Sequence, residues 1–255
     1  MIDPSAIIDP TATLGENVSI GPWTVIGPNV EIGDNCQIAS HVVIRGPSKI
    51  GCNNKIYQFS TIGDDTPDLK YKGEPTRLII GDNNCIREGV TIHRGTVQDK
   101  GETIIGDNNL LMAYAHVGHD SVIGNHVIMV NNASLAGHVI VGDWAILSGY
   151  ALIHQYVSIG AHSFIGPAAF SYHDVPAFIT AFGSPAEPRT INREGLKRRG
   201  FSVEQIALVN KAYKLLYRRG LSIEEATVAI AELGDDPVIE TMLDSLKIST
   251  RGIIR

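Results

Sequence analysis

The chain has 255 residues, of which 44% are hydrophobic, 19% are charged and only 6% are aromatic, with 26 glycines and 12 prolines. These values fit a folded globular protein with a sizeable core, and they exclude a disordered or collagen-like chain. The formal net charge of −6 excludes a protein that binds nucleic acid through a generally basic surface.

The sequence contains no run of about 20 apolar residues such as a membrane-spanning helix needs, and its first residues lack the basic and apolar segments of a signal peptide. We therefore expect a cytoplasmic protein without stable membrane insertion. The three cysteines, Cys36, Cys52 and Cys85, agree with a reducing compartment, because their spacing matches neither a disulfide framework nor a metal site.

An aliphatic residue occurs at every sixth position through most of the chain. The series runs from Ile2 to Ile62, from Ile80 to Ile92 and from Ile105 to Ile165, which makes 25 hexads. A period of six is neither the 3.6 of a helix nor the 2 of an isolated strand. It fits a short strand followed by a corner, so that three hexads close one triangular coil of 18 residues. A β-sandwich would instead show strands about 8 to 12 residues apart without a strict period.

These hexads predict a parallel β-helix over residues 1–188, with the repeated aliphatic residues stacked inside it. Two polar stretches containing glycine, residues 64–78 and 93–104, interrupt the hexads. A β-helix wall needs neither stretch, so both are predicted to be loops that leave the coils. Loops on a rigid scaffold are common places for binding residues.

Residues 189–255 are predicted to form a small α-helical domain. Capping boxes begin two helices at Ser202 and Ser222, and Asp236-Pro237 begins a third. This segment has 12 Lys or Arg against 9 Asp or Glu, a charge of +3, whereas the rest of the chain carries −9. A basic surface of this kind suits an acidic partner.

Residues 18 apart stack on neighbouring coils, which brings several polar residues together. An imidazole base can take a proton from a hydroxyl at neutral pH, and a glycine N–H can stabilise an oxyanion, so the cluster suits acyl transfer. The residues gathered in this way are His116, His119, Asp120, Gly137, His138, His154 and Gln155.

Four other histidines, His41, His126, His162 and His173, lie outside this cluster and are expected to have ordinary roles. A competing interpretation is a metal hydratase similar to the γ-class carbonic anhydrases, with His116, His119 and His138 as zinc ligands. A purely structural repeat protein is a further alternative.

The pattern over residues 2–170 resembles the hexapeptide-repeat family of left-handed parallel β-helices, and the left hand is taken from that resemblance. A more specific resemblance, to the UDP-N-acetylglucosamine O-acyltransferase family, extends over essentially the whole chain. The segments that carry it are DLKY (68–71), GEPTR (73–77), TIHRGT (91–96), YAHVGHD (114–120), NN (131–132), LAGH (135–138), GLKRRGF (195–201) and STRG (249–252).

The resemblance implies transfer of an (R)-3-hydroxyacyl group from acyl carrier protein to the 3-hydroxyl of UDP-N-acetylglucosamine, the first step of lipid A biosynthesis. It implies a homotrimer with sites between subunits. His119 would be the general base, Asp120 would orient or polarise it, and the Gly137 N–H would hold the oxyanion. No metal and no cofactor is implied beyond the phosphopantetheine thioester of the carrier protein, because a thioester is already activated.

The resemblance also assigns binding residues. Pro167 falls on the position that limits acyl-chain length in the family, and we expect a chain of medium length. For the sugar and the reacting groups the implied residues are Asp68, Lys70, His138 and Gln155, with His116 and His154 nearby. For the UDP end they are Asn192, Glu194 and Arg199, with Arg198 on the nucleotide or carrier-protein side. Arginine suits both pyrophosphate and an acidic carrier protein.

The UDP-3-O-acylglucosamine N-acyltransferase of the same pathway is the closest alternative. Members of that family carry a uridine-binding domain before their hexads, whereas the hexads here begin at Ile2. The DLK and GLKRR segments also favour the O-acyltransferase.

Overall fold

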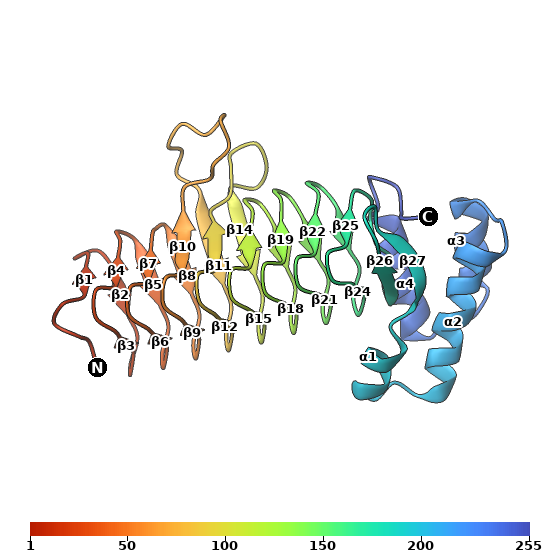
Figure 1. Cartoon of the computed structure of the whole chain (residues 1–255), viewed down its shortest axis with the longest axis horizontal. Coiled ribbons are helices and arrows are strands. Elements are labelled where there is room, and N and C mark those ends of the chain that lie inside the picture. Colours follow the sequence, from red (N-terminus) through yellow and green to blue (C-terminus); the bar gives the residue numbers. More distant parts are fainter.

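The chain forms 27 short strands arranged in three sheets, the walls of a triangular prism, and the hexads supply the strands as far as Ile165. The computed structural model describes all 255 residues. Figure 1 shows the prism as a row of coils with a group of helices at its C-terminal end. One sheet contains, in spatial order, β1 (Ile7–Ile8), β4 (Val25–Ile26), β7 (Val43–Ile44), β10 (Thr61–Asp64), β13 (Thr91–His93), β16 (His116–Val117), β19 (Ser134–Leu135), β22 (Leu152–Ile153) and β25 (Phe170–Ser171).

The other two walls follow the same rule, except at the end of the third sheet, since each strand pairs in parallel with the strand three positions along the chain. The second sheet contains β2 (Thr13–Leu14), β5 (Val30–Ile32), β8 (Ser48–Ile50), β11 (Arg77–Ile80), β14 (Glu102–Ile105), β17 (Val122–Ile123), β20 (Ile140–Val141) and β23 (Ser158–Ile159). The third contains β3 (Ser19–Ile20), β6 (Gln37–Ile38), β9 (Lys55–Ile56), β12 (Cys85–Ile86), β15 (Leu110–Leu111), β18 (Ile128–Met129), β21 (Ile146–Leu147), β24 (Phe164–Ile165), β26 (Ile179–Phe182) and β27 (Glu187–Ile191). At the end of the third sheet, β24 pairs in parallel with β26, and β26 pairs antiparallel with β27.

The repeated aliphatic residue of each hexad points into the prism. Ile44, Ile62, Ile92 and Val117, for example, are completely buried. Residues 18 apart face each other in register where no loop intervenes, as Val117 and Leu135 do on β16 and β19. The predicted stacking of successive coils is therefore confirmed.

Corner residues adopt left-handed backbone conformations, and many of them are not the glycine, asparagine or aspartate expected at such positions. Twenty residues other than glycine have positive φ, among them histidines and aromatic residues. Their side chains lie in rows along the edges of the prism, and several of their rings are in contact. Three edges are named here by one member each: the Asp120 edge (Asp120, His138, Tyr156), the Trp144 edge (His126, Trp144, His162, Phe178) and the Tyr150 edge (Trp23, His41, Phe59, Tyr114, Tyr150).

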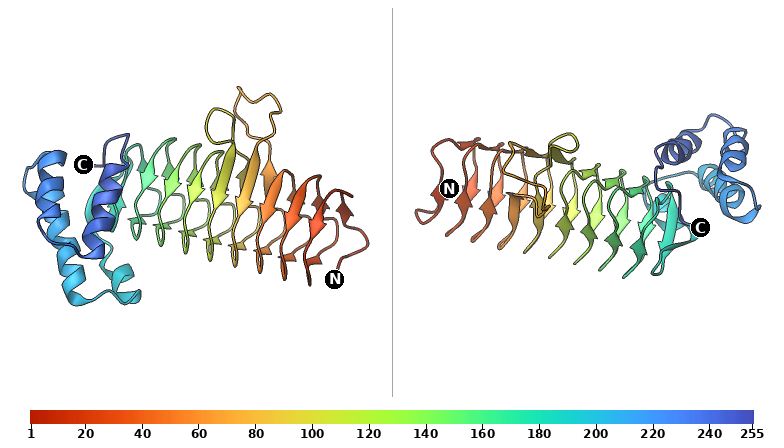
Figure 2. Two further views of the ribbon diagram at one scale, coloured as in Figure 1. Left: turned by 180° about the vertical axis from the view of Figure 1, so that it is seen from behind. Right: turned by 90° about the horizontal axis from the view of Figure 1, so that it is seen from above.

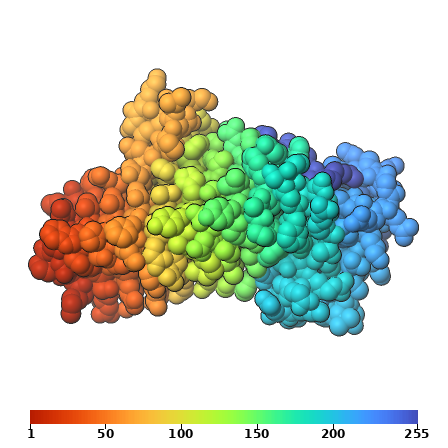
Figure 3. All heavy atoms as spheres, viewed as in Figure 1, coloured from red at the N-terminus to blue at the C-terminus, as the bar shows by residue number.

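Two loops leave the coils, as predicted, but they are shorter than the polar stretches in the sequence. β10 continues to Asp64 and β11 begins at Arg77, so the first loop spans residues 65–76. The second spans residues 94–101, because β13 and β14 extend the ladders on either side of it. Both loops leave the same side of the prism (Figures 1 and 2) and form a protrusion on its surface (Figure 3).

The C-terminal part begins slightly later than residue 189. β27 pairs antiparallel with β26 as far as Ile191, so it extends the third sheet across the predicted boundary. The helices that follow are α1 (Arg193–Arg198), α2 (Val203–Arg218), α3 (Ile223–Ala231) and α4 (Pro237–Lys247). The three predicted helices are confirmed, including both capping boxes, whereas α1 was not predicted.

The end of the chain returns to the prism. The Asp174 carboxylate accepts hydrogen bonds from the Ser249 hydroxyl and from the backbone N–H groups of Thr250 and Arg251. Ile253 then forms a parallel bridge with Asp174. The helices are thus attached to the β-helix at both ends, and none of the four is long and apolar enough to cross a membrane.

Candidate active site

A cavity of about 580 Å³, called the His119 cavity, lies on the Asp120 edge beside the first loop. Strand register brings its histidines together, and the loop contributes the residues that come from outside the coils. Its lining residues are Pro67, Asp68, Lys70, His116, Gly118, His119, Ala136, Gly137, His138, Gln155 and Tyr156. The structure therefore gathers His116, His119, Gly137, His138 and Gln155, as the 18-residue register predicted, and adds Asp68 and Lys70, as the family resemblance implied.

His119 is held by a buried carboxylate. Its Nδ1 lies 2.8 Å from Oδ2 of Asp120, and the Asp120 side chain is only 1% exposed, against 17% for His119. Burial raises the pKa of the Asp120 carboxyl, but hydrogen bonds from His119 and Thr96 outweigh burial and leave that pKa below its ordinary value. Asp120 is therefore ionised at neutral pH, so Nδ1 of His119 donates to it and Nε2 is left to accept a proton.

Gly137 lies directly against the His119 ring. A Cβ atom on Gly137 would stand 2.6 Å from Cε1 and Nε2 of His119, so no larger residue fits without moving that ring. The N–H of Gly137 forms no hydrogen bond within the chain. A free backbone donor thus lies next to a histidine that can act as a base.

His138 lies between two carboxylates. Its Nδ1 is 3.1 Å from Oδ2 of Asp99, in the second loop, and its Nε2 is 3.7 Å from Oδ2 of Asp120. The ring also stacks on Tyr156, with centroids 4.3 Å apart, and meets the His119 ring edge-on at 5.0 Å. Asp99 and Tyr156 were not among the predicted site residues.

His116 is a neutral member of the cluster. Its Nδ1 lies 2.7 Å from the Thr91 hydroxyl. Burial, with help from the nearby His93 and His119, lowers the pKa of His116 to about 4. It can therefore exchange hydrogen bonds with a ligand at neutral pH but does not carry a charge there.

Arg94 fixes the first loop to the coils. Its buried guanidinium donates to the Gly63 carbonyl, the Asp65 carboxylate and the Tyr71 hydroxyl. Within the loop, the Asp68 carboxylate accepts a hydrogen bond from the Lys70 N–H at 2.9 Å. Asp68 and Lys70 therefore line the cavity from an anchored loop.

Two predicted residues, His154 and Pro167, do not line the His119 cavity. His154 points toward Tyr172, with ring centroids 5.6 Å apart, and does not line the His119 cavity. Pro167 is exposed at the turn after β24 and lines neither the His119 cavity nor the Glu194 cavity described next.

A second cavity, of about 370 Å³, lies at the Trp144 edge and is called the Glu194 cavity. All four residues predicted for the nucleotide end line it. The sequence analysis expected ordinary roles for His126 and His162. Together with Trp144, however, they show the same 18-residue spacing that identified the His119 cluster. The lining residues are His126, Ile128, Trp144, Ile146, Phe164, Asn192, Glu194, Gly195, Arg198 and Arg199.

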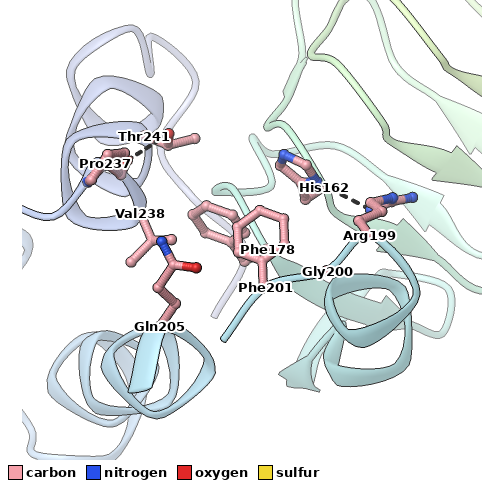
Figure 4. Close-up of a pocket in the computed structure, with 9 residues that line it drawn as sticks. All are labelled: His162, Phe178, Arg199, Gly200, Phe201, Gln205, Pro237, Val238 and Thr241. Atoms are coloured by element: carbon pink, nitrogen blue, oxygen red, sulfur yellow. Dashed lines mark hydrogen bonds between the residues drawn. The ribbon is translucent and has the colours of Figure 1, made fainter. Parts of the chain in front are cut away.

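Arg199 is partly buried and forms no ion pair with a carboxylate of the chain. Its guanidinium donates to the Trp144 carbonyl at 2.8 Å, lies 3.2 Å from Nδ1 of His162 and covers the Trp144 ring at 5.2 Å. Burial lowers the pKa of Arg199, and burial together with Arg199 lowers that of His162 to about 4. Figure 4 shows Arg199 and His162 in the neighbouring pocket between the prism and the helices.

Asn192 has a structural role in this arrangement. Its Oδ1 accepts the Gly195 N–H and caps α1, while its Nδ2 donates to the His162 carbonyl at 2.9 Å. Glu194 and Arg198, by contrast, are exposed on α1.

The metal-ligand trio considered from the sequence is not the group that comes together. The donor atoms that lie within 4.8 Å of one another belong to His119, Asp120 and His138, not to His116. Oδ2 of Asp120 already accepts hydrogen bonds from His119 and from the Thr96 hydroxyl. The cluster therefore has the hydrogen bonding of a carboxylate that orients a base.

Comparisons with known proteins show which family the chain belongs to. Residues 174–254 match a family model described as UDP N-acetylglucosamine O-acyltransferase, domain 2, and residues 1–46 and 102–137 match the bacterial transferase hexapeptide model. A protein of Stutzerimonas stutzeri named acyl-[acyl-carrier-protein]–UDP-N-acetylglucosamine O-acyltransferase is 63% identical over 83% of this chain and 82% of its own length. A protein of the same name from Saccharophagus degradans is 64% identical over 85% of this chain and 84% of its own.

Solved structures give the same result. The UDP-N-acetylglucosamine acyltransferase of Francisella novicida is 44% identical, with a TM-score of 0.98 over all of this chain and 94% of that chain. The O-acyltransferase of Moraxella catarrhalis is 43% identical, with a TM-score of 0.98 over all of this chain and 99% of that chain. The predicted fold class, a left-handed parallel β-helix with a small α-helical C-terminal domain, is confirmed. The chain is an acyltransferase and belongs to the UDP-N-acetylglucosamine O-acyltransferase family.

Proposed function

We propose that the protein transfers an (R)-3-hydroxyacyl group from acyl carrier protein to the 3-hydroxyl of UDP-N-acetylglucosamine, the first step of lipid A biosynthesis. The observation that carries the proposal is a histidine, His119, oriented by a buried carboxylate and touching a glycine whose N–H is free. The names of the relatives support the two substrates.

The reaction needs one base and one oxyanion donor. Nε2 of His119 accepts the proton of the sugar 3-hydroxyl while the oxygen attacks the thioester carbonyl carbon. The carbonyl oxygen becomes an oxyanion, which the Gly137 N–H stabilises. The tetrahedral intermediate then collapses, the C–S bond breaks, and the protonated His119 returns its proton to the leaving thiolate. The Asp120 carboxylate stabilises the imidazolium between these steps.

Charge and hydrogen bonding in the His119 cavity suit a sugar nucleotide. Lys70 is the one Lys or Arg that lines the cavity, so we assign it to an anionic or strongly polar group of the substrate. Neutral His116 and the side chains of Asp68, His138 and Gln155 supply hydrogen bonds for sugar hydroxyls and the reacting groups. Glu194, Arg198 and Arg199 are assigned to the nucleotide end, and Arg198 also to the carrier-protein side.

We further propose a homotrimer, because the parts of the site lie on different edges of one chain. The His119 cavity is on the Asp120 edge and the Glu194 cavity is at the Trp144 edge. Three prisms around a common axis would bring the second cavity of one copy against the first cavity of the next. The exposed aromatic residues of the Tyr150 edge supply apolar surface for such contacts, since Phe59, Tyr114 and Tyr150 are each about two-thirds exposed.

No metal takes part in the proposed reaction, because the thioester is the activated group. The basic C-terminal residues fit an acidic carrier protein. Pro167 remains our candidate for the residue that limits acyl length, and we expect a chain of medium length.

The test is a radiolabelled transfer assay with UDP-N-acetylglucosamine and a panel of (R)-3-hydroxyacyl carrier proteins from short to long chains, with and without a chelator. Chelator-insensitive ester formation with a maximum at medium length is expected. Amide formation on a 3-O-acylated sugar amine would support the N-acyltransferase instead, and loss of activity with the chelator would support a metal-dependent reaction.

A further inference from the structure

The segment His93-Arg94-Gly95-Thr96 has no role in the reaction described above, although it leads directly from β13 into the second loop. Thr96 is fully buried, with 1% of the residue exposed. Buried hydroxyls need hydrogen-bond partners, and the partner of this one is the carboxylate that orients the base.

Thr96 binds both oxygens of Asp120. The Thr96 N–H donates to Oδ1 at 2.8 Å, and the Thr96 hydroxyl donates to Oδ2 at 2.7 Å. These two bonds fix the plane of the carboxylate. Oδ2 is also the oxygen that faces His119 at 2.8 Å and His138 at 3.7 Å.

The rest of Asp120 is fixed from another element. Its N–H donates to the Thr103 hydroxyl on β14 at 2.8 Å. Asp120 is therefore held at its backbone by one strand and at its carboxylate by the second loop. The groups that contact its side-chain oxygens are Thr96, His119 and His138, and Asp99 stands on the far side of His138.

The path of the chain before Thr96 is equally constrained. A Cβ on Gly95 would lie 2.2 Å from the Glu102 nitrogen, so only glycine fits where the loop closes on itself. Arg94 is anchored to β10 through the Gly63 carbonyl and to the first loop through the Asp65 carboxylate. The Thr96 N–H and hydroxyl are therefore delivered to Asp120 at a fixed position.

We propose that Thr96 is a positioning residue that sets the orientation of His119 by holding the Asp120 carboxylate. The inference rests on the proposed function for its effect on rate, but its effect on the His119 ring does not depend on which reaction the enzyme catalyses. A carboxylate free to rotate would present Oδ2 to His119 less often, and Nε2 would be misaligned with the substrate hydroxyl.

The test compares three variants. Thr96→Val removes the hydroxyl and keeps the shape, Thr96→Ser restores the hydroxyl, and Thr24→Val is the matched control. Thr24 is also completely buried, and its hydroxyl donates to the Ala39 carbonyl at 2.7 Å in an N-terminal coil remote from the site. Thermal unfolding and the oligomeric state are measured for each variant.

The first readout is transfer kinetics. Thr96→Val is expected to lower kcat at least about tenfold, with KM for UDP-N-acetylglucosamine changed by less than about twofold. Thr96→Ser and Thr24→Val should stay within about threefold of the wild-type kcat. In an Asp120→Ala background, Thr96→Val should have no further effect, because it acts through that carboxylate.

The second readout is NMR of the His119 imidazole in protein with labelled histidine, assigned with a His119→Gln variant. The Nδ1–H resonance hydrogen-bonded to Asp120 should be weakened or lost in Thr96→Val and kept in Thr96→Ser and Thr24→Val. An unchanged resonance with unchanged kcat in Thr96→Val would overturn the proposal, as would an equal loss in Thr24→Val.

The two readouts separate the two proposals. If the wild-type enzyme fails to acylate the sugar nucleotide but Thr96→Val loses the resonance, the positioning role stands and the proposed function falls. If Thr96→Val does not fold, Thr96→Cys, which keeps the size and supplies a much weaker donor, is judged by the same criteria.

Discussion

His138 and Asp99 are 39 residues apart in the sequence, yet Nδ1 of the imidazole lies 3.1 Å from the carboxylate. The contact joins a corner of the β-helix to the second loop and holds one of the three histidine rings that line the cavity. Replacing Asp99 with alanine removes this partner and leaves the more distant Asp120 carboxylate. We expect kcat/KM for the sugar nucleotide to fall about 3- to 10-fold.

Steady-state kinetics measures this effect, and Lys100→Ala is its control. Lys100 is the exposed neighbour of Asp99 in the same loop and makes no ion pair. A loss of kcat/KM in Lys100→Ala as large as that in Asp99→Ala would mean that any substitution in the second loop lowers activity, and that the contact between Asp99 and His138 is not the cause.

His119→Ala should abolish most of the activity without unfolding the protein. A general base contributes about 100- to 10,000-fold to rate, so a loss of kcat in that range is expected. The ring is partly exposed in a preformed cavity, and its removal leaves the coils intact. The single-turnover rate is the direct measurement, accompanied by circular dichroism. Turnover close to that of the wild type would remove His119 from the mechanism.

Gly137→Ala tests the close approach of backbone and base. The added Cβ would stand 2.6 Å from the His119 ring and push it away, so kcat should fall about 10- to 100-fold. Gly149→Ala is a matched control at another corner, 12 residues along the chain, because its Cβ would meet nothing closer than 3.5 Å. Equal activities in the two variants would show that the space at Gly137 does not matter for the reaction.

The sequence predicted the cluster around His119 because no insertion breaks the 18-residue register between residues 105 and 165. Asp120 and His138 meet for that reason alone, as do Gly137 and His119. The same arithmetic applied to His126 would have found the Trp144 edge.

The loop contributions were not predictable in this way. Thr96 and Asp99 belong to a loop that leaves the coils, so no period relates them to Asp120 or His138. The antiparallel strand β27 escaped prediction because it follows the last hexad and pairs with β26 through a reversal of the chain. Helix α1 has only six residues, too short for a helical period to appear.

The stability of the protein should fall between pH 6.5 and pH 4, partly through His162. Its pKa is lowered from 6.5 to about 4 in the folded state by burial and by Arg199. In that pH range the unfolded chain binds a proton at this histidine that the folded chain does not, so acidification favours unfolding. The protein therefore has the full stability associated with a neutral His162 above pH 6.5 and loses it progressively as the pH falls towards 4. Because the ring is partly exposed, the change is about 1 to 2 kcal/mol rather than the full value for such a shift.

Urea unfolding of the wild type and His162→Phe at pH 7 and pH 4.5 measures this contribution. Phenylalanine keeps an aromatic ring between Trp144 and Phe178 but does not titrate. The variant should lose less stability on acidification than the wild type. The same loss in both proteins would assign the pH dependence to other groups, among them His116, whose pKa is also about 4.

Replacement of aromatic residues on the Tyr150 edge should dissociate the proposed trimer. Tyr114 and Tyr150 are 65% and 64% exposed in one chain, and burying such surface between copies is the main source of free energy for association. The double variant Tyr114→Glu/Tyr150→Glu places carboxylates in that contact and should elute as a monomer in light-scattering chromatography. Because the His119 and Glu194 cavities would then no longer face each other, transfer activity should be lost together with the trimer. Val203→Glu is the control, since Val203 is also an exposed apolar residue, at 79%, but lies on the first turn of α2 and away from that edge. A monomeric double variant with full activity would show that one chain contains the whole site.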